Sequence, residues 1–214
     1  MTSTEPGEFD LAAFLTKNQK PILTGTVTAV AVVAIGWFWV ASQNLKAEKA
    51  ETAFGNAERA FYSGNPQLAE TELSKMVQRY GGTQAGVRAS MLLAQTYFEM
   101  AKPDQGVSRL RDVVGSGAAK AFRAPIYSLI GAGLDNQKKF DSAATAYAQA
   151  AAASPTTMDR EAYLARQAVS LTAAGKNPDA IKVWQTIAAH ETSPLAPEAK
   201  LRLGELSAAP AKGS

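Results

Sequence analysis

The sequence predicts an all-α protein with an N-terminal single transmembrane helix, followed by an α-solenoid of about four helix pairs and a C-terminal capping helix. Two observations predict this architecture: a long apolar run without charged residues near the N-terminus, and a 37-residue repeat through the remainder of the chain. The 214 residues suffice for one globular unit and an additional segment.

The apolar run extends from Pro21 to Leu45 without one charged residue. A helix of roughly 20 such residues spans the roughly 30 Å hydrocarbon core of a bilayer, so residues 21–41 are predicted to cross the membrane. Trp37, Phe38 and Trp39 lie at the end of this run, where aromatic rings favour the headgroup region and would anchor the helix. The lipid bilayer is therefore one predicted partner, and residues 1–20 form a short N-terminal tail.

Two alternatives concern this segment. A cleaved signal peptide is disfavoured because its apolar core is usually about 7 to 15 residues long, and because the preceding tail contains three acidic residues. The orientation is not decided by charge, since two lysines flank each end of the run. A short N-terminal tail inside the cell and a large domain outside is the common arrangement.

A repeat of 37 residues follows the apolar run. Small residues recur at this spacing, and a second small residue stands twelve positions before each of them, while a large apolar residue follows four positions later. These spacings are typical of paired helices that pack closely through their small residues. The four copies contain, in order, Ala57, Ala69 and Leu73; Ala94, Gly106 and Leu110; Gly131, Ala143 and Tyr147; and Ala168, Ala180 and Trp184.

Turn signals recur in phase with these positions, for example Gly64-Asn65-Pro66, which suits a helix end followed by an N-cap and a proline in the first turn. The repeat domain is predicted to cover residues 43–207, with a flexible tail at 208–214. Helices are predicted at 43–62, 66–80, 84–100, 104–114, 121–136, 140–153, 159–174, 178–190 and 195–207, and the last of these is the capping helix.

Composition excludes several classes of function. The chain has no cysteine and one histidine, His190, which excludes thiolate zinc sites, cysteine nucleophiles and multi-histidine metal sites. The net charge of +3 arises from scattered residues, so no nucleic-acid surface is indicated. No phosphate-binding motif or acid pair is recognised. We therefore expect no enzyme activity, no catalytic residues, no cofactor and no metal, and we interpret His190 as a cation at a helix end.

The small residues of each copy, together with the aromatic Tyr97, resemble tetratricopeptide (TPR) repeats, which usually run 34 residues. The whole plan, with one span ending in Gly36-Trp37-Phe38-Trp39 and repeats closing on Ser193-Pro194-Leu195-Ala196-Pro197, resembles the bacterial ancillary SecYEG translocon subunit family. This resemblance implies a single-pass protein of the inner (cytoplasmic) membrane with its C-terminal repeats in the periplasm. It also implies the translocon and periplasmic chaperones as partners.

A groove lined by the first helix of each copy is the candidate binding site for partner proteins. An apolar strip with polar neighbours would receive an extended peptide or a partner helix. The alternative is that these aromatics are ordinary core between helices. The predicted groove residues are Phe54, Glu58, Phe61, Arg88, Met91, Gln95 and Phe98.

The sequence thus predicts a membrane-anchored TPR-like protein-protein interaction scaffold without catalysis, ancillary to the Sec translocon and periplasmic chaperones. The alternative function is that of a permanent structural accessory subunit of a larger membrane protein complex, docked through its span and aromatic anchor. The identity of the partner and the oligomeric state are left open by the sequence.

Overall fold

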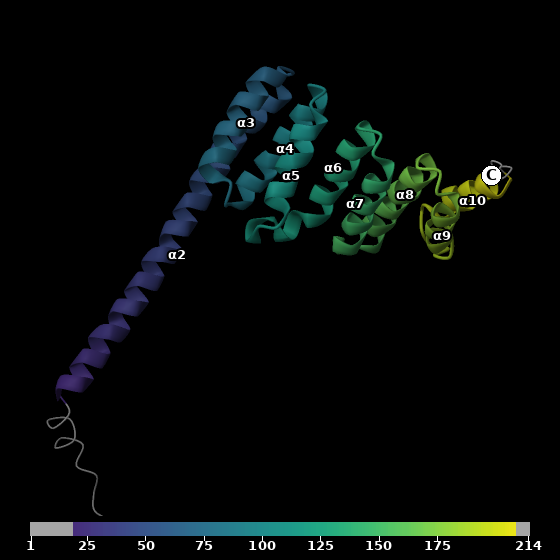
Figure 1. The fold of residues 1–214 in the computed structure, drawn as a ribbon. Coiled ribbons are helices and arrows are strands. Elements are labelled where there is room, and N and C mark those ends of the chain that lie inside the picture. Colours follow the sequence, from purple (N-terminus) through teal and green to yellow (C-terminus); the bar gives the residue numbers. More distant parts are fainter. Residues whose placement is uncertain (1–18, 209–214) are drawn as a thin grey trace, which may run out of the picture. The chain divides into compact units, whose positions relative to one another are not determined.

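The computed structural model describes the backbone of residues 19–208 and the side chains of residues 30–208. The chain divides into two compact units, Met1–Lys46 and Ala47–Ser214, which are described separately. Figure 1 shows the helices in chain order. They are α2 (Gln19–Tyr62), α3 (Pro66–Tyr80), α4 (Gln84–Glu99), α5 (Pro103–Val114), the 3-10 helix η1 (Gly117–Phe122), α6 (Arg123–Asn136), α7 (Phe140–Ala153), α8 (Thr157–Ala173), α9 (Asn177–Ala188) and α10 (Ala196–Ala208).

The described part of the first unit is the N-terminal portion of α2. Its apolar side chains are exposed from Val30 to Val40, and Trp37 is 73% exposed. Among the residues whose side chains are described, no helix has both the length and the apolar character needed to cross a membrane. Residues 21–29 of the predicted span lie outside that set, as do the whole predicted N-terminal tail and residues 209–214 of the predicted C-terminal tail.

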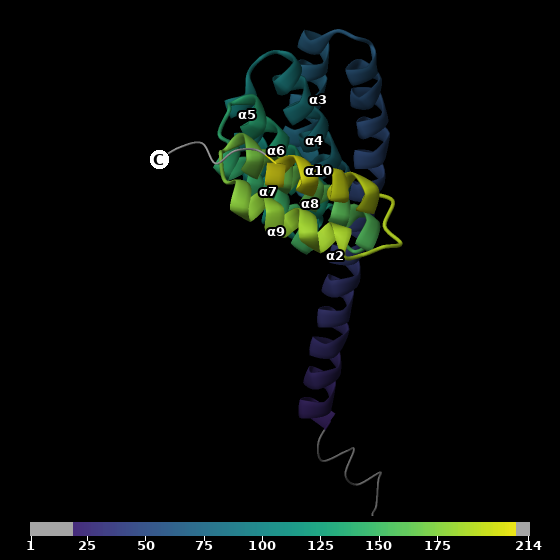
Figure 2. The same ribbon diagram turned by 90° about the vertical axis from the view of Figure 1, so that its right-hand side faces the viewer.

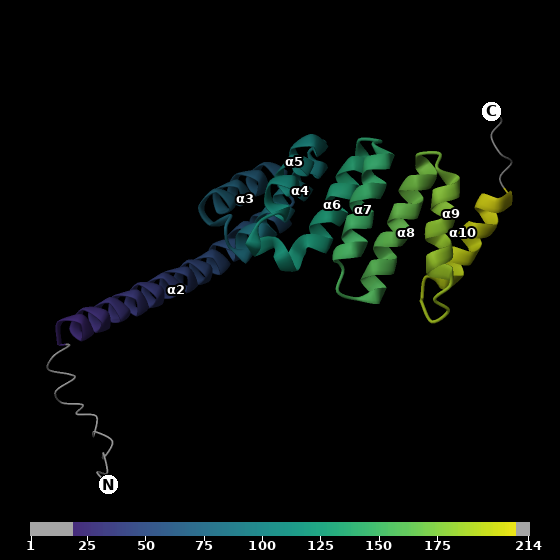
Figure 3. The ribbon, with the colours of Figure 1, turned by 60° about the horizontal axis from the view of Figure 1, so that its bottom comes forward.

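The second unit is a series of antiparallel helices, each of which packs mainly on the next one along the chain. Figure 3 shows α6 to α10 side by side in this order, and Figure 2 views the same unit with α9 and α10 nearest the reader. The predicted helices agree with the structure within two residues, with one exception. The predicted helix 43–62 is continuous with the preceding segment in α2. The predicted helix 121–136 corresponds to α6, and its first two residues belong to η1.

The 3-10 helix η1 is an additional turn that precedes α6. Ser116 Oγ accepts a hydrogen bond from the backbone N–H of Ala119 at 3.2 Å, which caps η1 before α6 can begin. A hydroxyl that captures one of the free N–H groups at a helix start stabilises that start. The sequence prediction placed residues 115–120 between two helices, so this additional turn was not predicted.

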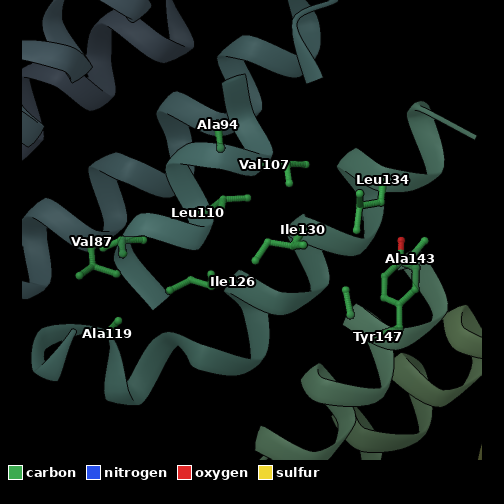
Figure 4. Packing of buried hydrophobic residues seen from close by; sticks show 12 residues of the cluster. Val87, Ala94, Val107, Leu110, Ala119, Ile126, Ile130, Leu134, Ala143 and Tyr147 are labelled. Atoms are coloured by element: carbon green, nitrogen blue, oxygen red, sulfur yellow. The ribbon is translucent and has the colours of Figure 1, made fainter. Parts of the chain in front are cut away.

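The repeat positions are buried as the 37-residue spacing predicts. The large residue of each copy, Leu73, Leu110, Tyr147 and Trp184, is at most 3% exposed. The central cluster joins α4, α5, η1, α6 and α7, and Figure 4 shows Val87, Leu110 and Ile126 among its members. Two further clusters flank it, one centred on Leu73 and the other on Trp184. The hydrophobic core is therefore distributed along the array, as in other repeat proteins.

Each helix pair turns through one residue with left-handed backbone. These residues are Gly64, Ala101, Lys138 and Gly175, with φ between 55° and 77°. In the last three copies the next residue along donates its N–H to a carbonyl five residues earlier, as from Lys139 to Leu134 at 2.9 Å. This pattern is the Schellman motif, which ends a helix and favours glycine. Two copies thus place a side chain where glycine is preferred.

Replacing Lys138 with glycine is expected to stabilise the fold. Left-handed backbone costs a residue with a Cβ atom roughly 1 kcal/mol relative to glycine. We expect Lys138→Gly to raise the free energy of unfolding by about 1 kcal/mol in urea denaturation followed by circular dichroism. Lys138→Ala is the control, because it removes the same side chain but keeps the strained backbone. Equal stabilities of the two variants would contradict the prediction.

Candidate protein-binding surface

The predicted groove residues lie on two helices, α2 and α4, within the repeat unit. Phe54 is 3% exposed, and the Arg88 guanidinium carbon stands 4.0 Å from the centre of its ring. Arg88 Nη1 also lies 3.0 Å from Glu51 Oε2. A guanidinium over an aromatic face is attracted by the ring electrons. Phe54 is therefore a core residue whose outer face is covered by a charged pair.

The other aromatics of the predicted groove are partly buried. Phe61 packs against the cluster that contains Leu73, and its ring centre is 5.2 Å from that of Tyr62, which is 73% exposed. Met91 and Phe98 pack against the central cluster. Glu58 and Gln95 are half-buried. The surface around α2 and α4 is thus mixed, with aromatic edges beside polar groups, rather than a continuous apolar strip.

Phe98 is held by two glycines. A Cβ atom at Gly133 would stand 2.7 Å from Phe98 Cζ, and Gly106 is as tightly enclosed by the same ring. The ring thus occupies space that a side chain would take in α5 or α6. Phe98 contributes to packing between copies, and a substitution there would change stability as well as surface.

A hollow of about 310 Å³ lies near the C-terminal end of the array. We call it the C-terminal pocket, and its lining is predominantly apolar. In this lining, Val169 has the same position within its copy as Gln95 has two copies earlier. Thr172 corresponds to Phe98 in the same way. The pocket therefore shares part of its lining positions with the predicted groove. Its lining residues are Val169, Thr172, Ala173, Trp184, Arg202, Glu205 and Leu206.

A polar cross-link joins the third and fourth copies. Asp135 accepts hydrogen bonds from Ser170 Oγ at 2.9 Å and from Tyr147 Oη at 3.1 Å. Burial raises the pKa of Tyr147 to about 12, and the neighbouring Asp135 carboxylate acts in the same direction. The tyrosine hydroxyl consequently remains a donor at physiological pH. This cross-link stabilises the contact of α8 with α6 and α7.

A second polar cluster joins α8 to the loop before α10. Glu161 is 7% exposed, and its Oε1 lies 2.6 Å from His190 Nδ1. Ser193 Oγ donates to Glu161 Oε2, and Thr192 Oγ1 lies 3.0 Å from His190 Nε2. Burial raises the pKa of Glu161, but the hydrogen bonds from Ser193 and His190 and the charge of His190 outweigh it, so the pKa is lowered.

These contacts correct the interpretation of His190 as a helix-end cation. Helix α9 ends at Ala188, and His190 lies beyond it with Glu161 as its partner. Ser193 Oγ also accepts a hydrogen bond from the N–H of Leu195 at 3.1 Å. The cluster therefore positions the loop from which α10 starts. In the portion of the chain covered by the structure, no group of three or more His, Cys, Asp or Glu side chains could hold a metal ion.

Comparisons with known proteins agree with this architecture. The tetratricopeptide repeat-like domain family matches residues 12–126, which is more than half of the chain. The chain belongs to this family. No curated protein matches it. TPR-like folds among solved structures include two crystal structures from Podosopora anserina, both described as a putative kinesin light chain with nearly identical TPR-like repeats, one of them carrying a single substitution.

Both of these TPR-like structures have 16% sequence identity to the chain and a TM-score of 0.60. The similarity covers 75% of this chain and 85% or 86% of the other two. At this identity the similarity establishes the TPR-like fold alone. The family therefore supports a protein-binding surface, because TPR-like arrays expose one helix face along their length.

The C-terminal pocket and the Glu161 cluster were not predicted from the sequence. The sequence shows that Trp184 and Leu206 are apolar and that Glu161 is an acid at a helix start. However, neither the pocket nor the Glu161 cluster has a counterpart in the other copies. A repeat-based alignment finds what the copies share. Sites that depend on one copy and on the end of the array need the three-dimensional arrangement.

Proposed function

We propose that this protein is a membrane-anchored TPR-like scaffold that binds other proteins and does not catalyse a reaction. The observation that carries the proposal is the TPR-like array itself, shown by the family match and by the buried repeat positions. TPR-like arrays have an extended surface relative to their core, and such surfaces suit peptides and helices. The mixed aromatic and polar surface on α2 and α4 supports this role.

The anchor part of the proposal rests on the sequence from Pro21 to Leu45. In water, a helix surface with Val30, Ile35, Trp37, Phe38 and Trp39 all more than 60% exposed would be costly. A bilayer would remove these side chains from water, and the aromatic residues would lie at its interface. A single-pass inner-membrane protein with its repeats in the periplasm accounts for both the apolar segment and the charged repeat domain.

The partner part of the proposal rests on the resemblance to the ancillary SecYEG translocon subunit family. A scaffold at this site would bind the translocon and periplasmic chaperones, and its repeats would face emerging chains. The alternative is a permanent accessory subunit of another membrane complex. The exposed aromatics Trp37, Phe38 and Trp39 fit this accessory subunit as well as they fit the scaffold, because they would dock on a neighbouring transmembrane helix.

A quantitative pull-down distinguishes the ancillary scaffold from the permanent accessory subunit. The tagged full-length protein is purified from the native membrane in mild detergent, and the molar ratio of each co-purifying protein is measured. Substoichiometric recovery of translocon and chaperone components is expected for the ancillary scaffold. A fixed one-to-one ratio to an unrelated membrane complex would establish the structural subunit instead. Recovery of the tagged protein alone under cross-linking would contradict both.

Surface variants test whether α2 and α4 form the binding surface. Tyr62 is 73% exposed, and Glu58 and Gln95 are half-buried, so Tyr62→Ser with Glu58→Lys and Gln95→Glu should leave the core unchanged. We expect partner recovery to fall about tenfold or more, because losing a contacting aromatic and reversing a charge each weaken an interface. Glu191→Lys with Ala152→Ser, at exposed positions on other elements, is the control. Unchanged recovery with an unchanged melting temperature would exclude this surface.

A further inference from the structure

The C-terminal pocket has the size and chemistry of a site for one apolar side chain. Its volume of about 310 Å³ lies at the lower end of the roughly 300 to 1,000 Å³ typical of small-ligand pockets. Trp184 forms part of its wall, and Val169 is 52% exposed beside it. The hydroxyl of Thr172 already donates to the carbonyl of Ala168 at 2.9 Å. A ligand group buried here would therefore gain from being apolar rather than polar.

The charges at the pocket determine what can surround that side chain. Arg202 Nη1 lies 3.1 Å from Glu205 Oε2, and Arg202 Nε lies 3.7 Å from Glu198 Oε1. Two carboxylates thus accompany one guanidinium, and all three side chains are about half exposed. Because Arg202 is already neutralised, the rim does not favour a peptide carboxylate or another anion. It favours a cation, which would be attracted to Glu198 and Glu205.

We infer that the C-terminal pocket binds a partner protein through a Leu-sized or larger apolar side chain that is followed in an extended segment by Lys or Arg. The apolar side chain contacts Val169 and Leu206 over the buried Trp184, and the basic side chain lies near Glu205. This inference rests on the proposed scaffold function and adds a partner motif and a second surface to it. The pocket shares repeat positions with the predicted groove, so one extended partner could use both.

The test uses the full-length chain in mild detergent with Trp184 as the reporter. The chain has three tryptophans, so Trp37→Phe with Trp39→Phe leaves Trp184 as the remaining one. The probes are N-acetylated, C-amidated peptides with the sequence Gly-Ser-Leu-Lys-Ser-Gly. In one comparison peptide Ala replaces Leu, and in another Glu replaces Lys. A saturable change of Trp184 emission measures binding.

We expect the Leu-Lys peptide to bind about tenfold or more tightly than the Ala-Lys peptide, because leucine has more apolar surface than alanine to bury against the pocket lining. The Leu-Glu peptide should bind more weakly than Leu-Lys at low ionic strength, and Glu205→Gln should reduce that difference. Binding should be lost in Ala173→Phe, whose ring fills the pocket. Ala152→Phe, at an exposed alanine of α7 outside the pocket lining, is the matched control and should bind normally.

Three outcomes would overturn the inference: equal binding of the Leu and Ala peptides, no binding of either, or unchanged binding in Ala173→Phe. Should Ala173→Phe fail to fold, Val169→Gln tests the same wall at a position that is 52% exposed. Partner recovery in the pull-down separates this inference from the scaffold function. Failure of the peptides with normal partner recovery would remove the pocket and leave the scaffold. If the peptides do not bind and no partner is recovered, the pocket inference and the scaffold function are both rejected.

Discussion

Replacing Gly86 with alanine is expected to destabilise the protein by about 3 kcal/mol, because the space for a methyl group is occupied by backbone. A Cβ atom at Gly86 would stand 2.5 Å from the carbonyl carbon of Tyr80 and closer still to its oxygen. It would also stand 2.7 Å from Gly81 Cα. Contacts below 3.0 Å require a shift, and backbone shifts less easily than the end of a flexible side chain.

The Tyr80 carbonyl has little freedom to move away. It accepts hydrogen bonds from the N–H of Thr83 at 2.9 Å and from Thr83 Oγ1 at 2.8 Å. Thr83 Oγ1 in turn accepts from the N–H of Gly86 at 3.1 Å and so caps α4. The added methyl group would therefore disturb the turn between α3 and α4 and the cap together. The helix propensity gained by replacing glycine, at most about 1 kcal/mol, is smaller than this cost.

Gly82→Ala is the matched control, because Gly82 lies in the same turn and a Cβ atom there meets nothing within 4 Å. Thermal unfolding of the full-length protein should show a melting temperature about 6 to 12 °C lower for Gly86→Ala. Gly82→Ala should lie within about 0.5 kcal/mol of the parent. If both variants melt like the parent, the close approach of α4 to the Tyr80 carbonyl is not a feature of the native fold.

Gly86 illustrates how far the sequence alone could lead. The 37-residue spacing predicted the burial of Leu73, Leu110 and Trp184, because each copy repeats the same contact between neighbouring helices. Gly86 does not belong to that pattern. Its requirement arises from the local path of one turn, which differs between copies because the connections differ in composition and in where their helices begin and end. A periodic signal identifies shared packing, whereas a close backbone approach has no periodic signal.

The candidate binding surface was predicted less completely, and the reason is again geometric. Arg88 and Phe54 were both assigned to a groove from their repeat positions, but the guanidinium lies over the ring and removes it from the surface. A sequence cannot show that one long side chain covers another. The C-terminal pocket was missed because it forms beside α10, the last described helix, where the arrangement of the array ends.

Replacing Glu161 with alanine is expected to destabilise the protein by about 2 to 3 kcal/mol at neutral pH, because hydrogen bonds to a charged group contribute more than neutral ones. Glu161 is buried and receives hydrogen bonds from Ser193 and His190. Its loss would leave the hydroxyl of Ser193, which is 5% exposed, without its acceptor. The loop before α10 and the packing of α10 on α9 should loosen together.

The pH dependence of this effect follows from the lowered pKa of Glu161. The carboxyl binds a proton less readily in the folded protein than in the unfolded chain, so it stabilises the fold above its ordinary value of 4.5. That contribution is lost as pH falls from 4.5 through the lower folded pKa. Other carboxylates titrate in the same window, so the parent must be compared with Glu161→Gln, in which the titrating group is absent.

Urea unfolding between about pH 7 and pH 3 should therefore show a steeper acid loss in the parent than in Glu161→Gln. Glu191→Gln is the control, because Glu191 is an exposed acid in the same loop and its removal should leave the parent's slope nearly unchanged. Since α10 and Trp184 both line the C-terminal pocket, peptide binding there should weaken in Glu161→Ala as α10 loosens. Parallel slopes for the parent and Glu161→Gln would mean that Glu161 does not hold this end of the array.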